Sequence, residues 1–501
     1  MKLYSTRNLN MAAMPKKAII EGLAPDGGLF SPKIEDIENS KFDIKDLINY
    51  DYKKVALHVF KIFLSDFDEK DLEKCINAAY SNNNFPNYEN IVAPISKIGK
   101  DYLLELYHGR TSAFKDVALS ILPYFLTTAY KSESNKNKIY ILTATSGDTG
   151  KAALAGFQDV ENVNITVFYP TDGVSPIQKL QMQTSPGNNV DVVAINGNFD
   201  DCQRLVKEIY TDKNIFDLCQ KHNVILSSAN SINIGRLVPQ IIYYISSYIK
   251  LVKDNEIKLY DKVNFVVPTG NFGNILAGFI AKTLGLPINK LICASNENDV
   301  LTEFINTGSY NRNRQFYKTI SPSMDILVSS NLERLLFLLS NNDSNLISNL
   351  MADLNKNGSY KIQDFLLNKI KEHFVAFSAS ESECKAAIRE AFDKDHRLID
   401  THTAIAYAVL KKYNSSASSK NIILSTASPY KFAKSVLSSL NDTDIDSLND
   451  FDIIDKLFKM TNEPIPQNLL ELKTKKVRFN NVLSYSESKK YVEDKIAKEK
   501  L

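Results

Sequence analysis

The middle of the chain alternates between short apolar runs and segments with the spacing of amphipathic helices. Each run is rich in aliphatic residues and ends at a polar or glycine-containing turn. Continuous apolar runs are typical of strands that are buried on both faces. The runs predicted to be strands are 138–144, 164–170, 190–196, 223–228, 263–268, 291–295 and 421–427. This alternation predicts an α/β fold in which parallel sheets are flanked by helices.

The segments on either side of this region have different patterns. Residues 1–88 are charged and mainly helical in pattern, with a loop at APDGGLFSP, and are predicted to form an N-terminal domain. Residues 89–435 are predicted to form a core of two α/β lobes, with a polar helical insertion at about 311–395. Residues 436–501 are predicted to form a helical C-terminal extension.

Charge and cysteine usage argue against several classes of protein. The 501 residues include 60 basic and 58 acidic side chains, so there is no reason to expect a nucleic acid or an anionic membrane as the partner. The five cysteines are scattered, and neither a disulfide framework nor a metal site is expected. No apolar leader and no run of membrane-spanning length is present, so a cytoplasmic protein is expected.

Two glycine-containing turns follow strands and open helices, TSGDTG (145–150) and TGNFGN (269–274). Such turns point backbone N–H groups at one spot, where the helix dipole also favours an anion such as phosphate. The alternative is a tight turn without a ligand, but the amides of Asn271 and Asn274 can donate to a phosphate. Asp148 would repel an anion, so it either caps the helix or accepts from a cationic substrate group.

Lys115 lies at the start of an apolar helix, and three residues separate it from a turn with the sequence HGRT. Thr111 or Ser112 can cap this helix. Burial beside the apolar stripe and the positive helix N-terminus would both lower the pKa of the Lys115 amine. An amine with a lowered pKa can form a Schiff base. The alternative is a lysine whose stem is buried while its ammonium group reaches water.

Two later strand ends carry polar side chains that could bind a ligand. ANSINIGRL (229–237) contains Arg236, whose planar fork suits a phosphate or a carboxylate; a capping turn with a surface arginine is the alternative. STASPYKF (425–432) offers hydroxyls that could hydrogen-bond a heterocyclic nitrogen, although alone it indicates only a turn. For His108 and His402 a structural role is favoured over metal ligation.

Together these segments resemble threonine synthase, a pyridoxal-phosphate enzyme of fold type II. The matching segments occur in the family's order and are MKLYSTRN, APDGGLF, LYHGRTSAFKD, ILTATSGDTGKAAL, YPTDGVSPIQKLQM, NGNFDDCQRLVK, SSANSINIGRL, VPTGNFGN, THTAIAYAV and STASPYKF. The resemblance implies a fold like that of the tryptophan synthase β-subunit. It also implies pyridoxal 5'-phosphate as the cofactor and O-phospho-L-homoserine as the substrate, which with water would give L-threonine and phosphate. The protein would act as a monomer or a homodimer.

The resemblance also implies roles for individual residues. Lys115 matches the lysine that bonds covalently to the cofactor, and Thr426 matches the threonine that faces its pyridine nitrogen. The loop for the cofactor phosphate would comprise Gly270, Asn271, Phe272, Gly273 and Asn274. The substrate-binding residues would be Ser146, Asp148, Thr149, Asn230, Ser231, Asn233 and Arg236.

Four positions depart from the family's pattern. Arg110 and Thr401 stand where prolines are usual, Ser112 replaces an apolar residue, and Ser428 replaces a histidine. None of them removes the Schiff-base lysine or the phosphate loop, but they leave the details of substrate binding open.

Two other functions compete with this one. A different fold type II enzyme, such as a serine/threonine dehydratase or a cysteine synthase, commonly carries asparagine where this chain has Asp148. A non-catalytic pyridoxal-phosphate-binding relative is the second alternative. Retention of Lys115 together with both glycine turns argues against it.

Overall fold

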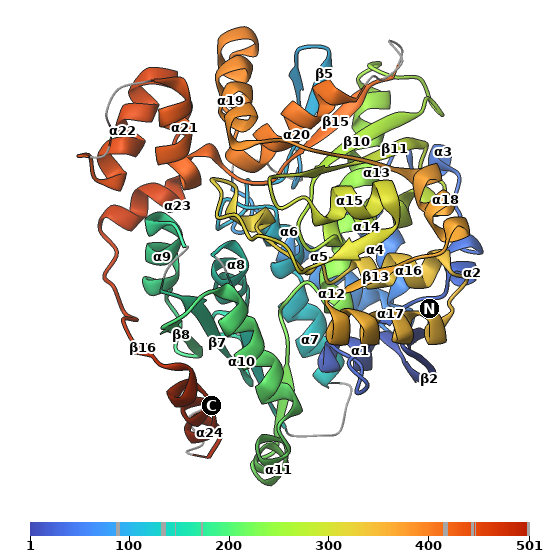
Figure 1. Cartoon of the computed structure of the whole chain (residues 1–501), viewed down its shortest axis with the longest axis vertical. Helices are drawn as coiled ribbons and strands as arrows, with labels where there is room; N and C mark the ends of the chain where they lie inside the picture. The colour runs from blue at the N-terminus through green and yellow to red at the C-terminus, as the bar shows by residue number, and fades with distance from the viewer. Residues whose placement is uncertain are drawn as a thin grey trace.

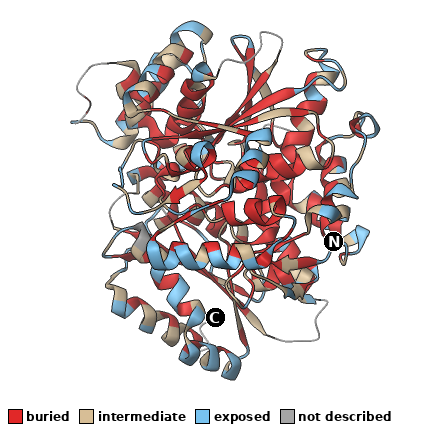
Figure 2. Cartoon of the chain, turned by 45° about the vertical axis from the view of Figure 1, so that its right-hand side comes forward, coloured by how far each residue is buried: buried red, intermediate tan, exposed pale blue. Residues whose placement is uncertain are grey.

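Two lobes, each built on a largely parallel sheet, form the body of the protein (Figure 1). A computed structural model of the chain describes residues 1–86, 91–131, 137–145, 147–171, 174–413, 419–441, 445 and 447–497. Buried residues are concentrated in the two sheets and in the helices packed against them (Figure 2).

The smaller lobe contains a five-stranded parallel sheet in the order β16-β8-β7-β6-β9. Its strands are β6 (Lys138–Ala144), β7 (Val163–Pro170), β8 (Val190–Ile195), β9 (Val224–Ser227) and β16 (Val482–Leu483). Alternate residues of β6 face opposite sides, as expected for a strand. Ile139 and Ile141 join the main core, together with helix α8 (Asp148–Phe157). Tyr140 and Leu142 join the cluster formed by α10 (Phe199–Thr211), α11 (Lys213–Lys221) and α24 (Tyr485–Ala497).

The larger lobe contains a six-stranded sheet in the order β14-β11-β10-β15-β5-β4, in which only β4 is antiparallel to its neighbour among the described pairs. Its strands are β4 (Ile95–Ile98), β5 (Asp101–Glu105), β10 (Val263–Pro268), β11 (Ile288–Ser295), β14 (Phe374–Ser378) and β15 (Asn421–Ser425). Phe265 of β10 packs with α13 (Pro239–Lys253) and α14 (Gly273–Thr283) on one face. Val266 packs with α19 (Glu381–Asp395) and α20 (Thr401–Lys412) on the other.

All seven runs that the apolar pattern predicts as strands are strands of these parallel sheets, so the α/β prediction is confirmed. The expected helical insertion at 311–395 is only partly helical. It contains α16 (Leu332–Leu339), α17 (Ser344–Asn357) and α18 (Asp364–His373), but also β14, which pairs with β11. The pattern misses β14 because α18 ends at His373 and the strand begins at Phe374, with no glycine or proline between them.

The N-terminal region is mainly helical, but it begins with a small antiparallel sheet that the pattern misses. The sheet has the order β2-β1-β3, formed by β1 (Leu3–Ser5), β2 (Asn8–Ala13) and β3 (Phe30–Ser31). The helices are α1 (Pro15–Glu21), α2 (Ile34–Glu38), α3 (Ile44–Leu47), α4 (Tyr52–Phe63) and α5 (Glu69–Ala79). In the APDGGLF loop, Asp26 accepts from the Ser5 hydroxyl and from the Gly28 N–H. A Cβ on Gly28 would lie 2.1 Å from Ser5 Oγ, so this close approach requires glycine.

Two adjacent residues of α16 hold the N-terminal region against the larger lobe. Glu333 accepts from the Thr6 hydroxyl and pairs with the Arg7 guanidinium at 2.8 Å. The Arg334 side chain is fully buried, and its Nε donates to the Phe30 carbonyl at 2.9 Å. These contacts join the start of the chain to a helix more than 300 residues later, which no local sequence pattern reveals.

The C-terminal extension runs from the larger lobe back to the smaller one (Figure 1). Its helices α21 (Ala433–Leu440), α22 (Asp450–Thr461) and α23 (Gln467–Leu470) precede β16 and α24. The extension is expected to be helical, but it also contains β16, a short edge strand beside β8. That strand is only Val482–Leu483, too short to be recognised from alternation.

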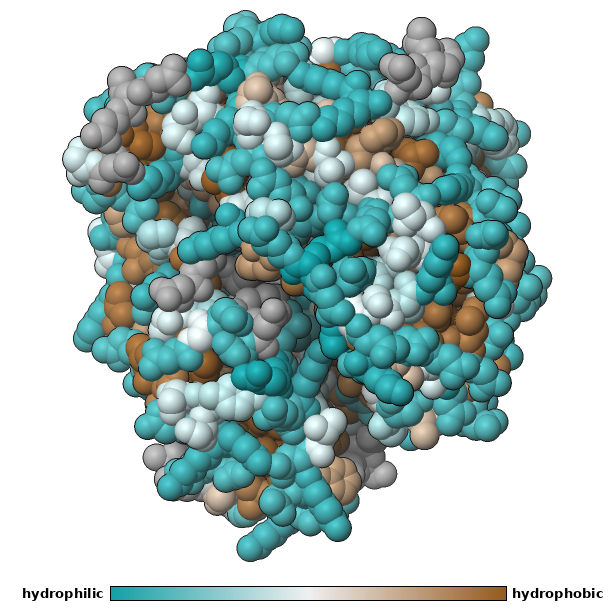
Figure 3. All heavy atoms as spheres, in the orientation of Figure 1, coloured by the Kyte–Doolittle hydropathy of each residue, from teal (hydrophilic) through white to brown (hydrophobic). Residues whose placement is uncertain are grey.

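The surface in Figure 3 is mostly hydrophilic, with apolar side chains in scattered patches. Among the described residues, no helix is both long enough and apolar enough to cross a membrane. Within the same residues, no three histidine, cysteine or acidic side chains gather in a group that could hold a metal ion. All five cysteines are buried with free thiols.

Replacement of Arg334 is expected to weaken the attachment of the N-terminal region. Its guanidinium also donates to the Ile232 carbonyl and to Asn331 Oδ1, so Arg334→Met leaves three acceptors, two of them in buried hydrogen bonds, without their donor. We expect the free energy of unfolding in urea to fall by about 2–4 kcal/mol. The control Arg204→Met removes an exposed guanidinium paired with Asp201 and should leave the free energy of unfolding nearly unchanged. Equal effects of the two replacements would contradict this account.

Candidate active site

A cavity lies between the lobes, where the strands of both sheets reach their carboxyl ends. Pro268 at the end of β10, Thr426 just after β15 and Thr149 in the first turn of α8 all line it. The space measures about 640 Å³, counting the part open to solvent. The carboxyl ends of parallel strands are the usual place for ligands in α/β proteins, and here two such edges face each other.

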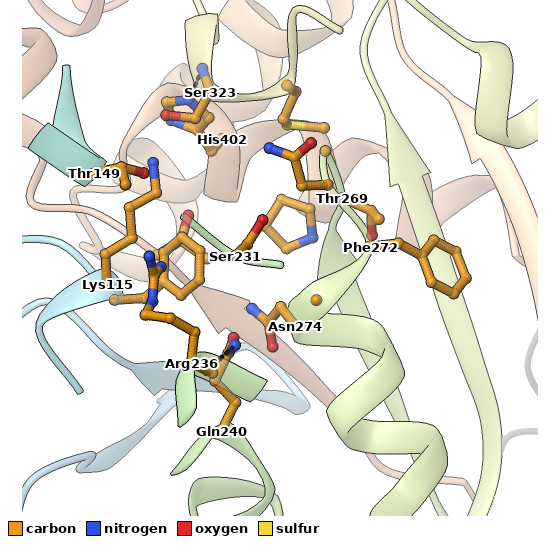
Figure 4. A pocket seen from close by; sticks show the side chains of 17 residues that line it. Lys115, Thr149, Ser231, Arg236, Gln240, Thr269, Phe272, Asn274, Ser323 and His402 are labelled. Atoms are coloured by element: carbon orange, nitrogen blue, oxygen red, sulfur yellow. Dashed lines mark hydrogen bonds between the residues drawn. The ribbon is translucent and has the colours of Figure 1, made fainter. Parts of the chain in front are cut away.

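The turn from Gly270 to Asn274 forms one wall of the cavity, and all five of its residues line it. α14 begins at Gly273, so its first backbone N–H groups lack partners within the helix, and its first residues line the cavity. Phe272 has a left-handed backbone, φ 61°, and its ring points away from the cavity (Figure 4). The ring is buried near Phe374, which stabilises this uncommon conformation.

The oxygen of the Asn274 side-chain amide has hydrogen-bond partners, and its nitrogen has none among the described residues. Its Oδ1 accepts from the hydroxyls of Tyr243 at 2.6 Å and Tyr244 at 3.0 Å. Its Nδ2 is buried and has no hydrogen-bond partner among the described residues. Because the two tyrosines fix the oxygen, the NH₂ group is presented to the cavity (Figure 4). A buried donor without a partner indicates a place where a ligand accepts a hydrogen bond.

Lys115 is the first residue of α6 (Lys115–Leu119), and its amine reaches into the cavity toward Thr149 (Figure 4). The Phe114 N–H donates to the Thr426 carbonyl at 2.8 Å, and Ala113 forms a β-bridge with Ala427. This backbone contact brings the two predicted cofactor residues Lys115 and Thr426 to the same wall. It joins segments that lie far apart in the sequence.

The pKa of the Lys115 amine is lowered to about 8. Burial is the main cause, and the cations Arg236 and Lys431 lower it further, while the Asp148 carboxylate raises it. An appreciable fraction of this amine is therefore uncharged near neutral pH, which a free lysine would not be.

The residues before Lys115 are held differently from the expectation. Neither Thr111 nor Ser112 caps α6, whose N-cap residue is Phe114. Thr111 instead donates from its hydroxyl and its N–H to the buried carboxylate of Asp116. Ser112 has a left-handed backbone, φ 57°, which takes it out of capping position.

The positions that depart from the family's pattern contact other parts of the protein. Arg110 donates to the Ala155 carbonyl and does not line the cavity. Asn468 of α23 donates to the Arg110 carbonyl and contacts the Ser112 hydroxyl. Ser428 caps the short helix η2 (Pro429–Phe432), and its N–H donates to the Ser112 carbonyl. These side chains hold the turn before Lys115 against the C-terminal part of the chain.

Asp148 is buried behind the cavity wall and does not line the cavity. It does not cap α8, since Gly147 is the N-cap residue. Its Oδ1 accepts from Gln178 Nε2 at 2.8 Å and forms an ion pair with Lys431. Burial alone would raise the pKa of the Asp148 carboxyl, but Lys431, and after it Lys115, bring it below its ordinary value. The neighbouring Ser146 lies outside the described residues.

The predicted substrate segment divides into residues that reach the cavity and residues that do not. Ser231 and Arg236 line the cavity. Arg236 donates to the Ala229 carbonyl, and its buried Nε has no partner among the described residues. Burial lowers the pKa of Arg236 to about 10, which leaves it charged near neutral pH. Asn230 does not line the cavity; its N–H donates to the Ser228 hydroxyl.

Asn233 is fully buried and is fully occupied by structural contacts. Its Oδ1 caps α12 (Ile234–Leu237) by accepting from the Gly235 N–H. Its Nδ2 donates to the Ile19 carbonyl in α1 at 2.9 Å and to the Ser228 carbonyl. It ties the N-terminal region to this segment and is not part of the cavity wall.

Several cavity residues cannot be predicted from the sequence because no local motif marks them. Ser323 and Met324 come from the short 3-10 helix η1 (Pro322–Met324) in the polar segment at 311–395, and Gln240 comes from α13. The Ser323 N–H donates to His402 Nε2 at 3.1 Å, while His402 Nδ1 contacts the Asp400 carboxylate at 2.8 Å. His402 thus has a satisfied structural position, although it also lines the cavity.

Comparison with known protein families divides the chain into three matching parts. Residues 2–80 match the family described as threonine synthase N terminus, and residues 403–492 match threonine synthase, C-terminal. Residues 97–427, most of the chain, match the family described as pyridoxal-phosphate dependent enzyme. That region contains Lys115, the 270–274 turn and Thr426.

Individual relatives agree with these matches. The threonine synthase of Saccharomyces cerevisiae is 34% identical over 97% of this chain and 96% of its own length. The human protein threonine synthase-like 1 is 40% identical over 86% of this chain, but the match spans only 58% of that longer protein.

Solved structures show the same relationship in three dimensions. The yeast threonine synthase structure matches 99% of this chain at 34% identity with a TM-score of 0.85. A pyridoxal-phosphate-bound threonine synthase from Brucella melitensis matches 98% of it at 34% identity with a TM-score of 0.84. The fold type II prediction is confirmed by these neighbours. Family matches, relatives and neighbours agree, and the chain belongs to the threonine synthase family of pyridoxal-phosphate-dependent enzymes.

Proposed function

We propose that this protein is a threonine synthase that converts O-phospho-L-homoserine and water to L-threonine and phosphate with pyridoxal 5'-phosphate. The observation that carries the proposal is the placement of the Lys115 amine and the Asn274 Nδ2 group in one cavity. The amine suits an aldehyde, and the unpartnered donor at the start of α14 suits a phosphate. A cavity of this size suits a small-molecule substrate. We propose that the protein acts in the cytoplasm as a monomer or a homodimer.

The described residues fit the cofactor. The phosphate would be held by Asn274 Nδ2 and by backbone N–H groups of the turn that starts at Gly270. The Thr426 hydroxyl would face the ring nitrogen as a neutral partner. Lys115 would hold the aldehyde end. Phosphate donor and amine therefore lie on different walls of one cavity, as a ligand with an aldehyde and a phosphate requires.

The reaction needs proton transfers and a site for the leaving phosphate. When bound, the cofactor supplies an electron sink for charge that develops on the substrate carbons. The Lys115 Nζ can accept a proton and return it, because its pKa lies close to neutral pH. Arg236 can bind the substrate phosphate with its free Nε and stabilise the charge on the departing group. Ser231 and Thr149 offer hydroxyls on the remaining sides of the cavity.

The proposal is tested by assaying the purified protein, supplied with pyridoxal phosphate, for equal release of phosphate and L-threonine from O-phospho-L-homoserine. We expect Lys115→Ala to abolish turnover, because the amine that moves the proton is lost. Lys131→Ala, which removes an exposed lysine of α7 (Leu122–Lys131), is the control and should retain activity. Turnover of serine or threonine without phosphate release from O-phospho-L-homoserine would favour a dehydratase, and near-normal turnover by the Lys115 variant would refute the assignment.

Replacement of Asn274 by aspartate is expected to weaken cofactor binding. Asn274→Asp keeps the shape of the side chain but puts a carboxylate where the NH₂ group now meets the cavity. Repulsion of the cofactor phosphate should raise the dissociation constant about tenfold or more, equivalent to about 1.4 kcal/mol. Spectrophotometric titration with pyridoxal phosphate measures this dissociation constant. Asn10→Asp, at an exposed position, is the matched control, and the same affinity in both variants would contradict the assignment of the phosphate site.

Arg236 and Asn233 belong to one segment but are expected to respond differently to replacement. Arg236→Gln should raise the KM for O-phospho-L-homoserine about tenfold or more, because a charge-assisted contact to its phosphate is lost. Asn233→Ala should leave KM nearly unchanged and lower the free energy of unfolding by about 1–3 kcal/mol, because it removes a helix cap and two buried hydrogen bonds. Steady-state kinetics and urea denaturation of both variants separate these effects. A large rise in KM for Asn233→Ala with unchanged stability would show that the residue binds substrate.

A further inference from the structure

We propose that Lys431 is a positioning residue that holds the Asp148 carboxylate away from Lys115 and so keeps the Lys115 amine available as a proton carrier. This inference rests on the proposed function and adds to it a residue that lies outside the cavity wall. Lys431 belongs to STASPYKF, a segment that the sequence analysis connects with the cofactor only through Thr426.

The Lys431 side chain connects three segments around the site. It begins in η2, after β15 of the larger lobe, and is buried with 0% of its side chain exposed. Its Nζ donates to the Thr111 carbonyl at 2.9 Å, in the turn just before Lys115. The same Nζ forms an ion pair with Asp148, in the first turn of α8 of the smaller lobe. One ammonium group therefore links both lobes to the turn that carries Lys115.

Asp148 is held from a second direction by Gln178. The Gln178 Nε2 donates to the same Oδ1 that meets Lys431, at 2.8 Å. Gln178 is itself fixed by a capping box with Ser175 at the start of α9 (Pro176–Gln183). A Cβ on Gly147 would lie 2.6 Å from Gln178 Cδ, so the chain beside Asp148 passes close to this amide. The carboxylate is thus oriented by two donors from segments other than that of Lys115.

The charges of Asp148 and Lys431 both affect the pKa of the Lys115 amine. Asp148 is the acidic group that favours the charged form of Lys115, while Lys431 and Arg236 oppose it. Lys431 also acts on two charged groups of neighbouring helices, because its charge lowers the pKa of Asp116 in α6 and of Lys151 in α8. Without Lys431, the buried carboxylate would lose its paired cation and Lys115 would become its nearest alternative partner. Lys115 would then retain its proton to a higher pH.

A purely structural role for Lys431 makes a different prediction. A buried ion pair can hold two lobes together without affecting the proton affinity of a third group. Replacement would then lower stability alone. The proton affinity of Lys115 is therefore the deciding quantity, and it can be measured in the full-length chain without cofactor.

The test measures the rate at which acetic anhydride labels Lys115 as a function of pH, read by mass spectrometry of its peptide in the cofactor-free protein. Only the uncharged amine reacts, so the pH profile reports the pKa of Lys115. In the wild type we expect a midpoint near 8. In Lys431→Met the midpoint should rise by about one unit, so labelling at pH 7 becomes about tenfold slower. Lys431→Arg keeps the charge and should stay close to the wild type.

Replacement of Asp148, the ion-pair partner of Lys431, gives a second, independent test. Asp148→Asn removes the carboxylate and should shift the Lys115 midpoint below that of the wild type. Combining Lys431→Met with Asp148→Asn should move it back toward the wild-type value, because both opposing charges are gone. In the cofactor-loaded enzyme, the acidic limb of kcat should shift in the same directions, because Lys115 would be a free amine only after substrate has bound. Circular dichroism identifies any variant that does not fold. If Lys431→Met does not fold, Asp148→Asn still tests the proposal.

An unchanged Lys115 midpoint in folded Lys431→Met, or in Asp148→Asn, would overturn the proposal. Labelling requires neither substrate nor cofactor, so its failure is distinguishable from failure of the proposed function. A protein with the expected labelling shifts that makes no threonine would support the role of Lys431 in setting the proton affinity of Lys115 and refute the threonine synthase activity.

Discussion

The site depends on one constraint: it must attract an anion while keeping an amine partly uncharged. Both requirements are met by the same excess of positive potential. Arg236 and the first N–H groups of α14 favour a phosphate, and Arg236 together with Lys431 opposes protonation of Lys115. Burial also lowers the pKa of the Lys115 amine. The buried Asp148 is compatible with this arrangement because its charge is already matched by Lys431.

The rest of the fold keeps these groups in place across long stretches of sequence. The Asn331 amide donates to the Asn271 carbonyl in the phosphate turn and accepts from the buried Arg334 guanidinium. The same guanidinium donates to the Phe30 carbonyl. The phosphate turn is therefore connected to the N-terminal region through α16. On the opposite side, Asn468 of the C-terminal extension binds the turn before Lys115. The parts of the chain outside the two parallel sheets thus contribute directly to the positions of the reactive groups.

The sequence predicts the groups that a local motif contains, and it misses those that meet only in the folded chain. The apolar runs predict the parallel strands, and the two glycine turns lie at helix starts as expected. The resemblance to the family implies that Asn233 binds substrate, but its amide donates to the Ile19 carbonyl, more than 200 residues away. Lys431 and Ser323 carry no signal in their own segments, because their roles arise from contacts with Asp148 and His402. The strand β14 is missed because it follows α18 without an intervening glycine or proline. The N-cap of α6 at Phe114 is missed because the Thr111 hydroxyl binds Asp116 instead of capping the helix.

The central claim is that the amine at Lys115, and no other buried lysine, holds the cofactor. It is tested most directly by reducing the protein with borohydride after incubation with pyridoxal phosphate and mapping the added mass by peptide mass spectrometry. The account predicts stoichiometric modification of the peptide containing Lys115, with Lys151 and Lys431 unmodified. Modification at either of those lysines in place of Lys115 would contradict it.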